Sequence, residues 1–317
     1  MGYKKFLFGP VPSRRFGRSL GVDLIPYKTC TLDCVFCQLG RTSNKTLLRK
    51  KYAPVEEVLK EIKEWLKTDG KADYITLSGS GEPTLHEQFG EVLAFIRDHS
   101  DIPSVLLTNG TLLYLPEVRQ AASLASVVKV SLSAWDQASY MRVNRPHPEL
   151  LFSGLIEGQK AFRSQFKGSL WMEVFLIGGM NSAKEEVNKI ASLAEEIAPA
   201  RIHLNTAVRP PAEGFVTPLS RDHIEELTQL FNPPAEVIAE FSTDKDLKLQ
   251  VNKDTVLAML RRRPCTAEQI ADGFGMHLNE VSKYLGNLIR ADQVRTERKD
   301  GNVYYEAVRM GNESNQK

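Results

Sequence analysis

Three cysteines stand close together in the segment YKTCTLDCVFCQLG, at positions 30, 34 and 37. Thiols at this Cys-x3-Cys-x2-Cys spacing favour a metal, because isolated structural cysteines scatter along a chain. A structural zinc ion normally takes four nitrogen or sulfur ligands, and no histidine or further cysteine follows within forty residues. A cubane [4Fe-4S] cluster accepts one thiolate per iron, so three cysteines would leave one iron open to a small molecule. An iron-sulfur cluster is therefore favoured over zinc.

This motif, with Phe36 just before its last cysteine, resembles the cluster motif of the radical S-adenosylmethionine (SAM) superfamily. The resemblance implies that Cys30, Cys34 and Cys37 bind a [4Fe-4S] cluster whose open iron binds SAM. It also implies reductive cleavage of SAM to methionine and a 5′-deoxyadenosyl radical. In such a reaction the cofactors carry out the bond cleavage and the protein positions them. The wider blocks GPVPSRRFGRSLGVDL and PYKTCTLDCVFCQLGRT are similar to a subgroup of Fe-S oxidoreductases related to the wybutosine-forming tRNA enzymes.

A second signal is the glycine-rich stretch SGSGEPTL, which follows a predicted strand. Glycines let the backbone approach a ligand closely, and Glu82 places a carboxylate at the strand end. The stretch resembles the Gly-Gly-Glu element with which radical SAM proteins bind the SAM amino group, although Ser80 replaces the first glycine. The resemblance implies a SAM site that includes Gly81, Glu82, Thr108, Asn109 and Ser131. It also places LIGGMNSAKE, Asn205 and Thr206 near the nucleoside.

Another polar group lies in SYMRVNRPHP, which contains Arg142, Asn144, Arg145 and His147. An arginine here could bind a substrate carboxylate or phosphate through two hydrogen bonds. The equally strong alternative is an arginine that staples the loop. His86 and His203 also lie near predicted strand ends, where a lone histidine is more often structural than catalytic.

The composition is that of a globular protein, with 317 residues of which 42% are hydrophobic. No run of about 18 apolar residues predicts a membrane span, and nothing at the start predicts export, so a cytoplasmic location is expected. The net charge of +2 is uneven, because residues 1–51 carry +9 and the remainder −7. The basic segment predicts either a face that attracts phosphates or charges that offset the cluster and nearby acidic groups.

Apolar runs alternate with amphipathic segments, which predicts β-α repeats on a parallel sheet. Strands are expected at 20–25, 74–78, 104–108, 127–133, 170–177 and 201–206. Helices are expected at 54–67, 87–98, 115–124, 149–166, 183–197 and 220–231. We expect a partial (β/α)6 barrel of the radical SAM type over residues 1–235, with ligands at the C-terminal ends of the strands.

Residues 246–310 predict a second module of three helices followed by a hairpin around Asp300-Gly301. The order resembles a winged helix-turn-helix, which binds DNA in some proteins and protein in others. The module carries a surplus of only two positive charges, so neither partner is favoured.

Two functions follow from these patterns. The favoured one is a radical SAM enzyme that takes electrons from a flavodoxin- or ferredoxin-type donor and abstracts hydrogen from a substrate. RNA is the hypothesis for the unidentified substrate, and a peptide or a small metabolite is the alternative that would also suit the basic segment. The alternative is a DNA-binding iron-sulfur regulator, which has no need for the glycine-rich stretch or an open iron. No oligomeric state is predicted.

Overall fold

The computed structural model describes residues 6–13, 16–207, 211–239, 253–274, 276, 278–299 and 302–308. The chain divides into two compact units, Met1–Glu240 and Phe241–Lys317, and each unit is described by itself. The predicted start of the second module near Asp246 and the predicted turn at Asp300-Gly301 lie outside the described residues.

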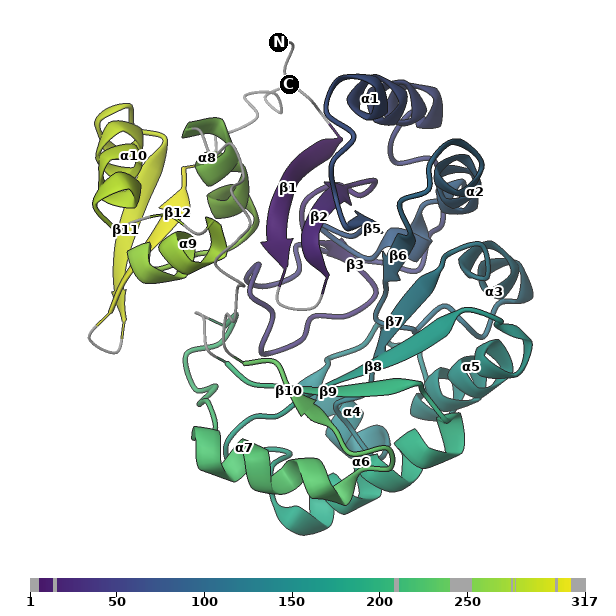
Figure 1. Ribbon diagram of the computed structural model, residues 1–317. Helices are drawn as coiled ribbons and strands as arrows, with labels where there is room; N and C mark the ends of the chain where they lie inside the picture. The colour runs from purple at the N-terminus through teal and green to yellow at the C-terminus, as the bar shows by residue number, and fades with distance from the viewer. Residues whose placement is uncertain are drawn as a thin grey trace, which may run out of the picture. The chain divides into compact units, whose positions relative to one another are not determined.

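The first unit is built on an eight-stranded sheet (Figure 1). The strands follow the order β1 (Leu7–Ser13), β2 (Gly17–Val22), β5 (Tyr74–Leu77), β6 (Ser104–Leu107), β7 (Val127–Ser131), β8 (Ser169–Phe175), β9 (Arg201–Asn205) and β10 (Glu236–Val237). From β2 to β10 every neighbouring pair is parallel, whereas β1 runs antiparallel to β2. The parallel sheet of the predicted α/β fold is confirmed, and each of the six predicted strands coincides with one of its members.

The sequence patterns miss β1 and β10, the two edge strands. In β1 the prolines at positions 10 and 12 argue against a strand, but an edge strand tolerates a residue that cannot donate to the ladder. A separate short parallel pair, β3 (Thr29–Cys30) and β4 (Asn44–Lys45), begins and ends the segment that holds the cysteines.

Helices cover the outer face of the sheet (Figure 1). They are α1 (Val55–Thr68), α2 (Phe89–His99), α3 (Pro116–Ala122), α4 (Gln137–Val143), α5 (Phe152–Gln165), α6 (Lys184–Ile197) and α7 (Arg221–Leu227), with 3-10 turns η1 (Pro83–Leu85) and η2 (Thr228–Leu230). Helix α1 buries Trp65, whereas Leu59 and Leu66 are only partly buried against the core. Helix α4 lies where the sequence predicted a loop, and Asp136 and Ser139 cap its start.

The two faces of the sheet differ in chemistry, because side chains alternate along each strand. Leu106, Val128 and Met172 belong to the large core between the sheet and the helices. On the opposite, inner face, Phe16, Val105, Val127 and Trp171 form a separate apolar cluster, in which the rings of Phe16 and Trp171 stack 5.0 Å apart. Two residues further along β7 and β8 the inner side chains become polar, so the inner face becomes polar toward the C-terminal ends of these strands.

The second unit contains α8 (Lys253–Arg262), α9 (Ala267–Phe274), α10 (Leu278–Arg290) and the antiparallel pair β11 (Val294–Lys299) and β12 (Asn302–Ala307). A capping box starts α9, since the side chains of Thr266 and Gln269 each accept a 3.2 Å hydrogen bond from the other residue's backbone amide. Cys265 lies in the core of this unit, and its backbone pairs with Tyr305. This fourth cysteine is thus a core residue of the second unit.

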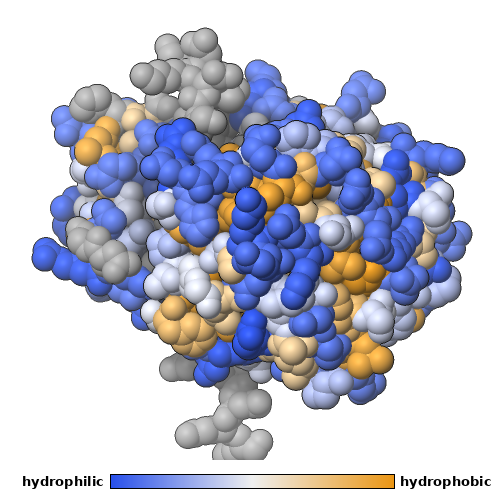
Figure 2. All heavy atoms as spheres, turned by 90° about the horizontal axis from the view of Figure 1, so that it is seen from below, coloured by the Kyte–Doolittle hydropathy of each residue, from blue (hydrophilic) through white to orange (hydrophobic). Residues whose placement is uncertain are grey.

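In the part of the chain that the structure describes, none of the helices has both the length and the apolar character needed to cross a bilayer. The face shown in Figure 2 is largely hydrophilic, with hydrophobic patches between the polar side chains.

Candidate metal centre and ligand site

The three clustered cysteines lie on a loop that leaves the C-terminal end of β2. Cys30 ends β3, and turns that follow place Cys34 and Cys37, with the Cys37 amide donating to the Cys34 carbonyl at 3.1 Å. All three side chains are half-buried. The loop therefore carries three half-buried cysteines within eight residues.

Each of the three sulfur atoms faces one nitrogen donor from a different segment. The Lys28 ammonium lies 3.2 Å from the Cys37 Sγ. The side-chain amides of Asn109 and Asn144 lie 3.5 Å from the Cys30 Sγ and 3.4 Å from the Cys34 Sγ. Donors aimed at sulfur stabilise thiolates and metal-bound thiolates. In the sequence Lys28 belongs to the basic segment 1–51, and nothing local marks it as a buried residue.

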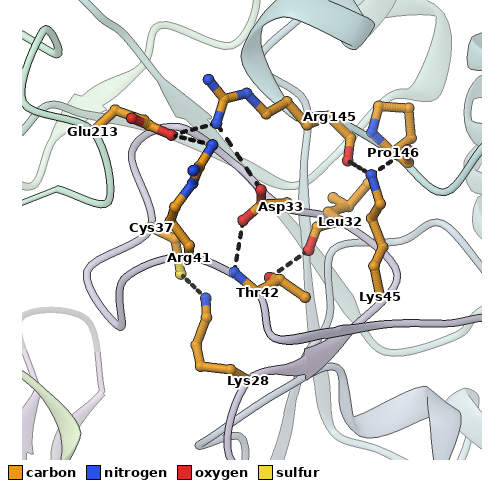
Figure 3. Close-up of polar contacts among 10 residues, drawn as sticks. All are labelled: Lys28, Leu32, Asp33, Cys37, Arg41, Thr42, Lys45, Arg145, Pro146 and Glu213. Carbon is orange, nitrogen blue, oxygen red and sulfur yellow. Dashed lines mark hydrogen bonds and ion pairs between the residues drawn. The ribbon is translucent and has the colours of Figure 1, made fainter.

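A network of polar contacts fixes the cysteine loop (Figure 3). The Asp33 carboxylate accepts a 2.6 Å hydrogen bond from the Thr42 amide, and its backbone amide donates to carbonyls at positions 144 and 145. Arg145 forms an ion pair with Glu213, which also pairs with Arg41 at 3.0 Å. Two roles were possible for Arg145, substrate binding and fixing the loop, and this ion pair supports the second. Glu213 gave no signal in the sequence, because it lies 176 residues beyond Cys37 in a proline-rich connector.

The glycine-rich loop after β5 packs directly on the start of the cysteine segment. A Cβ on Gly81 would lie 2.0 Å from the Thr29 carbonyl oxygen, and one on Gly79, whose φ is +130°, would lie 2.5 Å from the Asp23 carboxylate. Ser80, the residue that departs from the family pattern, donates its hydroxyl to Asp23 at 2.6 Å. These glycines therefore allow close contact between two loops, and the approach of Gly81 to a ligand stays a prediction.

Glu82 lies in the middle of this region and is almost fully buried. Its Oε1 accepts bonds from the backbone and the hydroxyl of Thr84 and from the hydroxyl of Thr108, and its Oε2 accepts one from the Asn109 amide. Burial raises the pKa of this carboxyl, and the four hydrogen bonds oppose that shift. Glu82 thus joins the turn after β5 to the turn after β6.

The structure brings four of the five residues predicted for SAM together. Gly81, Glu82, Thr108 and Asn109 lie at adjacent strand ends, and Asn109 also donates to Thr31 at 2.8 Å. The fifth, Ser131, ends β7 and is half-buried, and its hydroxyl has no partner in the described part of the chain. Ser131 is thus left with an unused hydroxyl.

An apolar group borders the cysteine loop. The ring of Phe36 stacks on Phe175 with 4.1 Å between centroids, and Ile177 and Met180 of the segment LIGGMNSAKE pack in the same cluster. The Thr206 hydroxyl is already used within the fold, since it donates a hydrogen bond to the Leu176 carbonyl.

Below these loops, the inner face carries a buried ion pair between Lys129 and Glu173, and Asn205 donates to the same carboxylate at 2.9 Å. The residues come from β7, β8 and β9. Asn205, which the resemblance places near the nucleoside, is thus hydrogen-bonded within the fold. Lys129 and Glu173 gave no functional signal in the sequence.

The cysteine environment fits an anionic iron-sulfur group. Burial, together with the charge of Glu82, raises the pKa of Cys30 to about 12, and burial also raises that of Cys34. Such thiols ionise when a cation replaces their protons. Lys28 is a buried cation, 3% exposed, directed at this group. Among the described residues, no three His, Cys, Asp or Glu side chains converge on a single metal ion. A cubane cluster does not require such convergence, because each thiolate binds a separate iron.

Comparison with known proteins agrees with this chemistry. The family model described as "Radical SAM superfamily" matches residues 24–194. The chain is 31% identical over 310 residues to UPF0026 protein MJ1312 of Methanocaldococcus jannaschii, covering 94% of each protein. It is 34% identical over 305 residues to a protein named GTPase Obg of Brachyspira hyodysenteriae, covering 95% of this chain but 45% of that relative.

Two solved structures share the fold. One is TYW1 with a lysine-pyruvate adduct bound, at a TM-score of 0.52 and 18% identity, covering 69% of this chain and 74% of that one. The other is a radical SAM methyltransferase from Sphaerobacter thermophilus, at 0.51 and 18%, covering 73% and 68%.

Proposed function

The chain belongs to the radical SAM superfamily, and from this premise we propose that Cys30, Cys34 and Cys37 hold a [4Fe-4S] cluster in an enzyme that cleaves SAM. The observation that carries the assignment is the set of three half-buried sulfurs on one loop, each facing a nitrogen donor. When bound and reduced, such a cluster supplies the electron that converts SAM to methionine and a 5′-deoxyadenosyl radical, which takes hydrogen from a substrate.

The turns at the strand ends would hold SAM beside the cysteine loop. Glu82 acts as a positioning residue, because its carboxylate fixes the two turns from which Thr84 and Asn109 come. Its Oε2 accepts one hydrogen bond, from the Asn109 amide, and keeps an acceptor position for an ammonium group. Thr108 contributes through Glu82, to which its hydroxyl donates, and Gly81 allows the loop to reach the cysteine segment.

Ser131 is the residue through which the SAM proposal can be tested most simply. Because its hydroxyl has no partner among the described residues, Ser131→Ala should weaken SAM binding without lowering the free energy of unfolding. Ser133→Ala is the matched control, since the Ser133 hydroxyl accepts a 3.0 Å bond from the Phe175 amide and its loss should cost about 1 kcal/mol of stability. SAM affinity unchanged in Ser131→Ala would remove this residue from the site.

The structure bears on RNA as the substrate through the basic segment, residues 1–51. Several of its basic side chains already bind protein groups: Arg18 pairs with Asp73, Arg49 donates to the Thr84 carbonyl and Lys45 donates to two carbonyls. This supports the alternative in which the segment offsets local negative groups, and it weakens the case for RNA. In the described part of residues 1–51, Lys50 and Lys51 are exposed and form no ion pair, and the Lys50 ammonium lies 5.0 Å from the centroid of the Tyr52 ring; these two lysines are the candidates for an RNA contact.

For the second unit, we propose a winged helix over residues 246–310. Three helices followed by an antiparallel hairpin support it. If the protein were a DNA-binding regulator, this unit would be the domain that binds DNA.

One experiment separates the two functions. Anaerobically reconstituted protein, reduced with dithionite and given SAM, should yield 5′-deoxyadenosine, whereas Cys34→Ala should yield none and should lose the cluster absorbance while still folding. Release of no 5′-deoxyadenosine by the wild type, together with a gel shift of promoter DNA, would replace the enzyme by the regulator. A flavodoxin- or ferredoxin-type protein should substitute for dithionite.

A further inference from the structure

Lys28 is an unusual lysine because its ammonium lies inside the protein beside a cysteine. The residue is 3% exposed and adopts a left-handed backbone conformation with φ of +58°. Its amide donates to the Ser80 carbonyl at 2.7 Å, and its carbonyl accepts from the Asn44 amide at 3.1 Å. Both backbone bonds hold the residue in place, so the side chain is directed at the Cys37 Sγ, 3.2 Å away.

The carboxylates of this region have other partners. Asp33 accepts from the Thr42 amide, Glu213 pairs with two arginines, and Glu82 accepts four hydrogen bonds. The contacts of the described residues thus give Lys28 a sulfur and no carboxylate. Since burial of an ammonium without a nearby anion costs several kcal/mol, the fold retains this lysine at a place where negative charge is expected.

We propose that Lys28 is a positioning residue that favours the reduced form of the cluster by placing a fixed positive charge and an N–H donor on the Cys37 sulfur. This inference rests on the proposed function. Three thiolates and an oxidised [4Fe-4S]²⁺ core together carry a charge of −1, and one electron from an external protein reductant makes the charge −2. A fixed cation stabilises the more negative state more strongly, so it raises the reduction potential of the cluster.

The donors on the other two sulfurs differ in charge. Asn109 and Asn144 contribute neutral amides at 3.5 and 3.4 Å, which are longer contacts. Hydrogen bonds from charged donors are roughly twice as strong as neutral ones. Lys28 should therefore have a larger effect on the potential than either asparagine.

The test is an EPR-monitored redox titration of the reconstituted full-length protein, in the wild type and in Lys28→Met, Lys28→Gln and Lys28→Arg. All three substitutions keep an L-residue at the same backbone conformation, so strain is matched. Lys45→Met is the control, because it removes a lysine of the same segment whose ammonium donates to backbone carbonyls at 3.1 and 3.2 Å. At a fixed ambient potential, Lys28→Met should hold at least tenfold less reduced cluster relative to oxidised cluster, a shift of about 59 mV for one electron.

The variants divide the outcomes. Lys28→Arg should stay near the wild type, Lys28→Gln should resemble Lys28→Met, and Lys45→Met should change the ratio far less. Equal midpoints in Lys28→Met and the wild type would overturn the inference while leaving the proposed function intact. If Lys28→Met and Lys28→Gln fail to assemble a cluster and Lys28→Arg assembles one, the need for a positive charge at this position is supported. If all three variants fail, the site requires the shape of the lysine side chain and not its charge, and the inference is refuted. A wild type that binds no cluster would instead refute the proposed function.

Discussion

Gly81 is the position at which the contact between the two loops can be broken with a single methyl group. In Gly81→Ala the new Cβ would lie 2.0 Å from the Thr29 carbonyl oxygen and 2.5 Å from the Ile25 Cγ2. The loops must separate, which breaks the bond from the Lys28 amide to the Ser80 carbonyl (2.7 Å) and that from the Glu82 amide to the Thr29 carbonyl (3.1 Å). The cysteine segment would then lose its main support.

The expected cost follows from these contacts. Two hydrogen bonds contribute about 1 kcal/mol each, and overpacking adds about 1–3 kcal/mol, so the free energy of unfolding should fall by about 3–5 kcal/mol. For a unit of this size each kcal/mol lowers Tm by about 2–4 °C, which gives about 6–20 °C. Iron bound per chain should also fall, since the disturbed loop carries the cysteines.

The assay is a thermal melt of the protein without iron, with bound iron and visible absorbance measured after reconstitution. Gly154→Ala is the matched control, because Gly154 lies in the first turn of α5 and its Cβ would meet no atom within 4 Å. That change should raise stability by about 0.5–1 kcal/mol. A Gly81→Ala protein that melts within about 2 °C of the wild type and binds full iron would refute the account of why glycine is needed there.

Three further predictions concern neighbouring groups. Glu82→Gln should lower the free energy of unfolding by about 1–3 kcal/mol in a urea titration, because its NH₂ would face the Asn109 amide; wild-type stability would count against the four-bond description. His86 has a pKa lowered by burial, so the unfolded chain takes up the proton first and stability should fall as the pH drops below about 6.5; His86→Gln should flatten that slope, and an equal slope in both proteins would contradict it. If RNA binds, Lys50→Ala with Lys51→Ala should reduce the dependence of log K on log salt by about 1.4–1.8; an unchanged slope would exclude contacts through these lysines.

The sequence predicts the parallel sheet well because buried strands of β-α units leave a strong signal of apolar runs between amphipathic helices. It fails where local signals conflict with the position in the fold. The prolines hide β1, and the short length of α4, only seven residues, hides that helix, even though the pair Asp136 and Ser139 is a helix-start signal that could have been used.

For the candidate site, the sequence predicts which strand ends come together but not how the side chains bond. Loops at the C-terminal ends of neighbouring parallel strands must meet, and so Glu82 and Asn109 lie close together as expected. The choice of Thr108 and Thr84 as partners of Glu82 depends on distances of a few tenths of an ångström between separate loops. The burial of Lys28 likewise depends on tertiary packing, since lysine is usually exposed.

The contacts around Glu82 also have a consequence for the way in which this region opens. The Lys28 amide bonds to the loop after β5, the Glu82 amide bonds back to the cysteine segment, and the Asn109 amide bonds to the Glu82 carboxylate. None of these three protons can exchange with solvent unless a bond to another strand end is broken, so they should exchange at a common rate as one cooperative unit. A ligand that binds any one of the three strand ends would therefore slow exchange at all of them, and under the proposed function loss of the cluster would loosen the proposed SAM site.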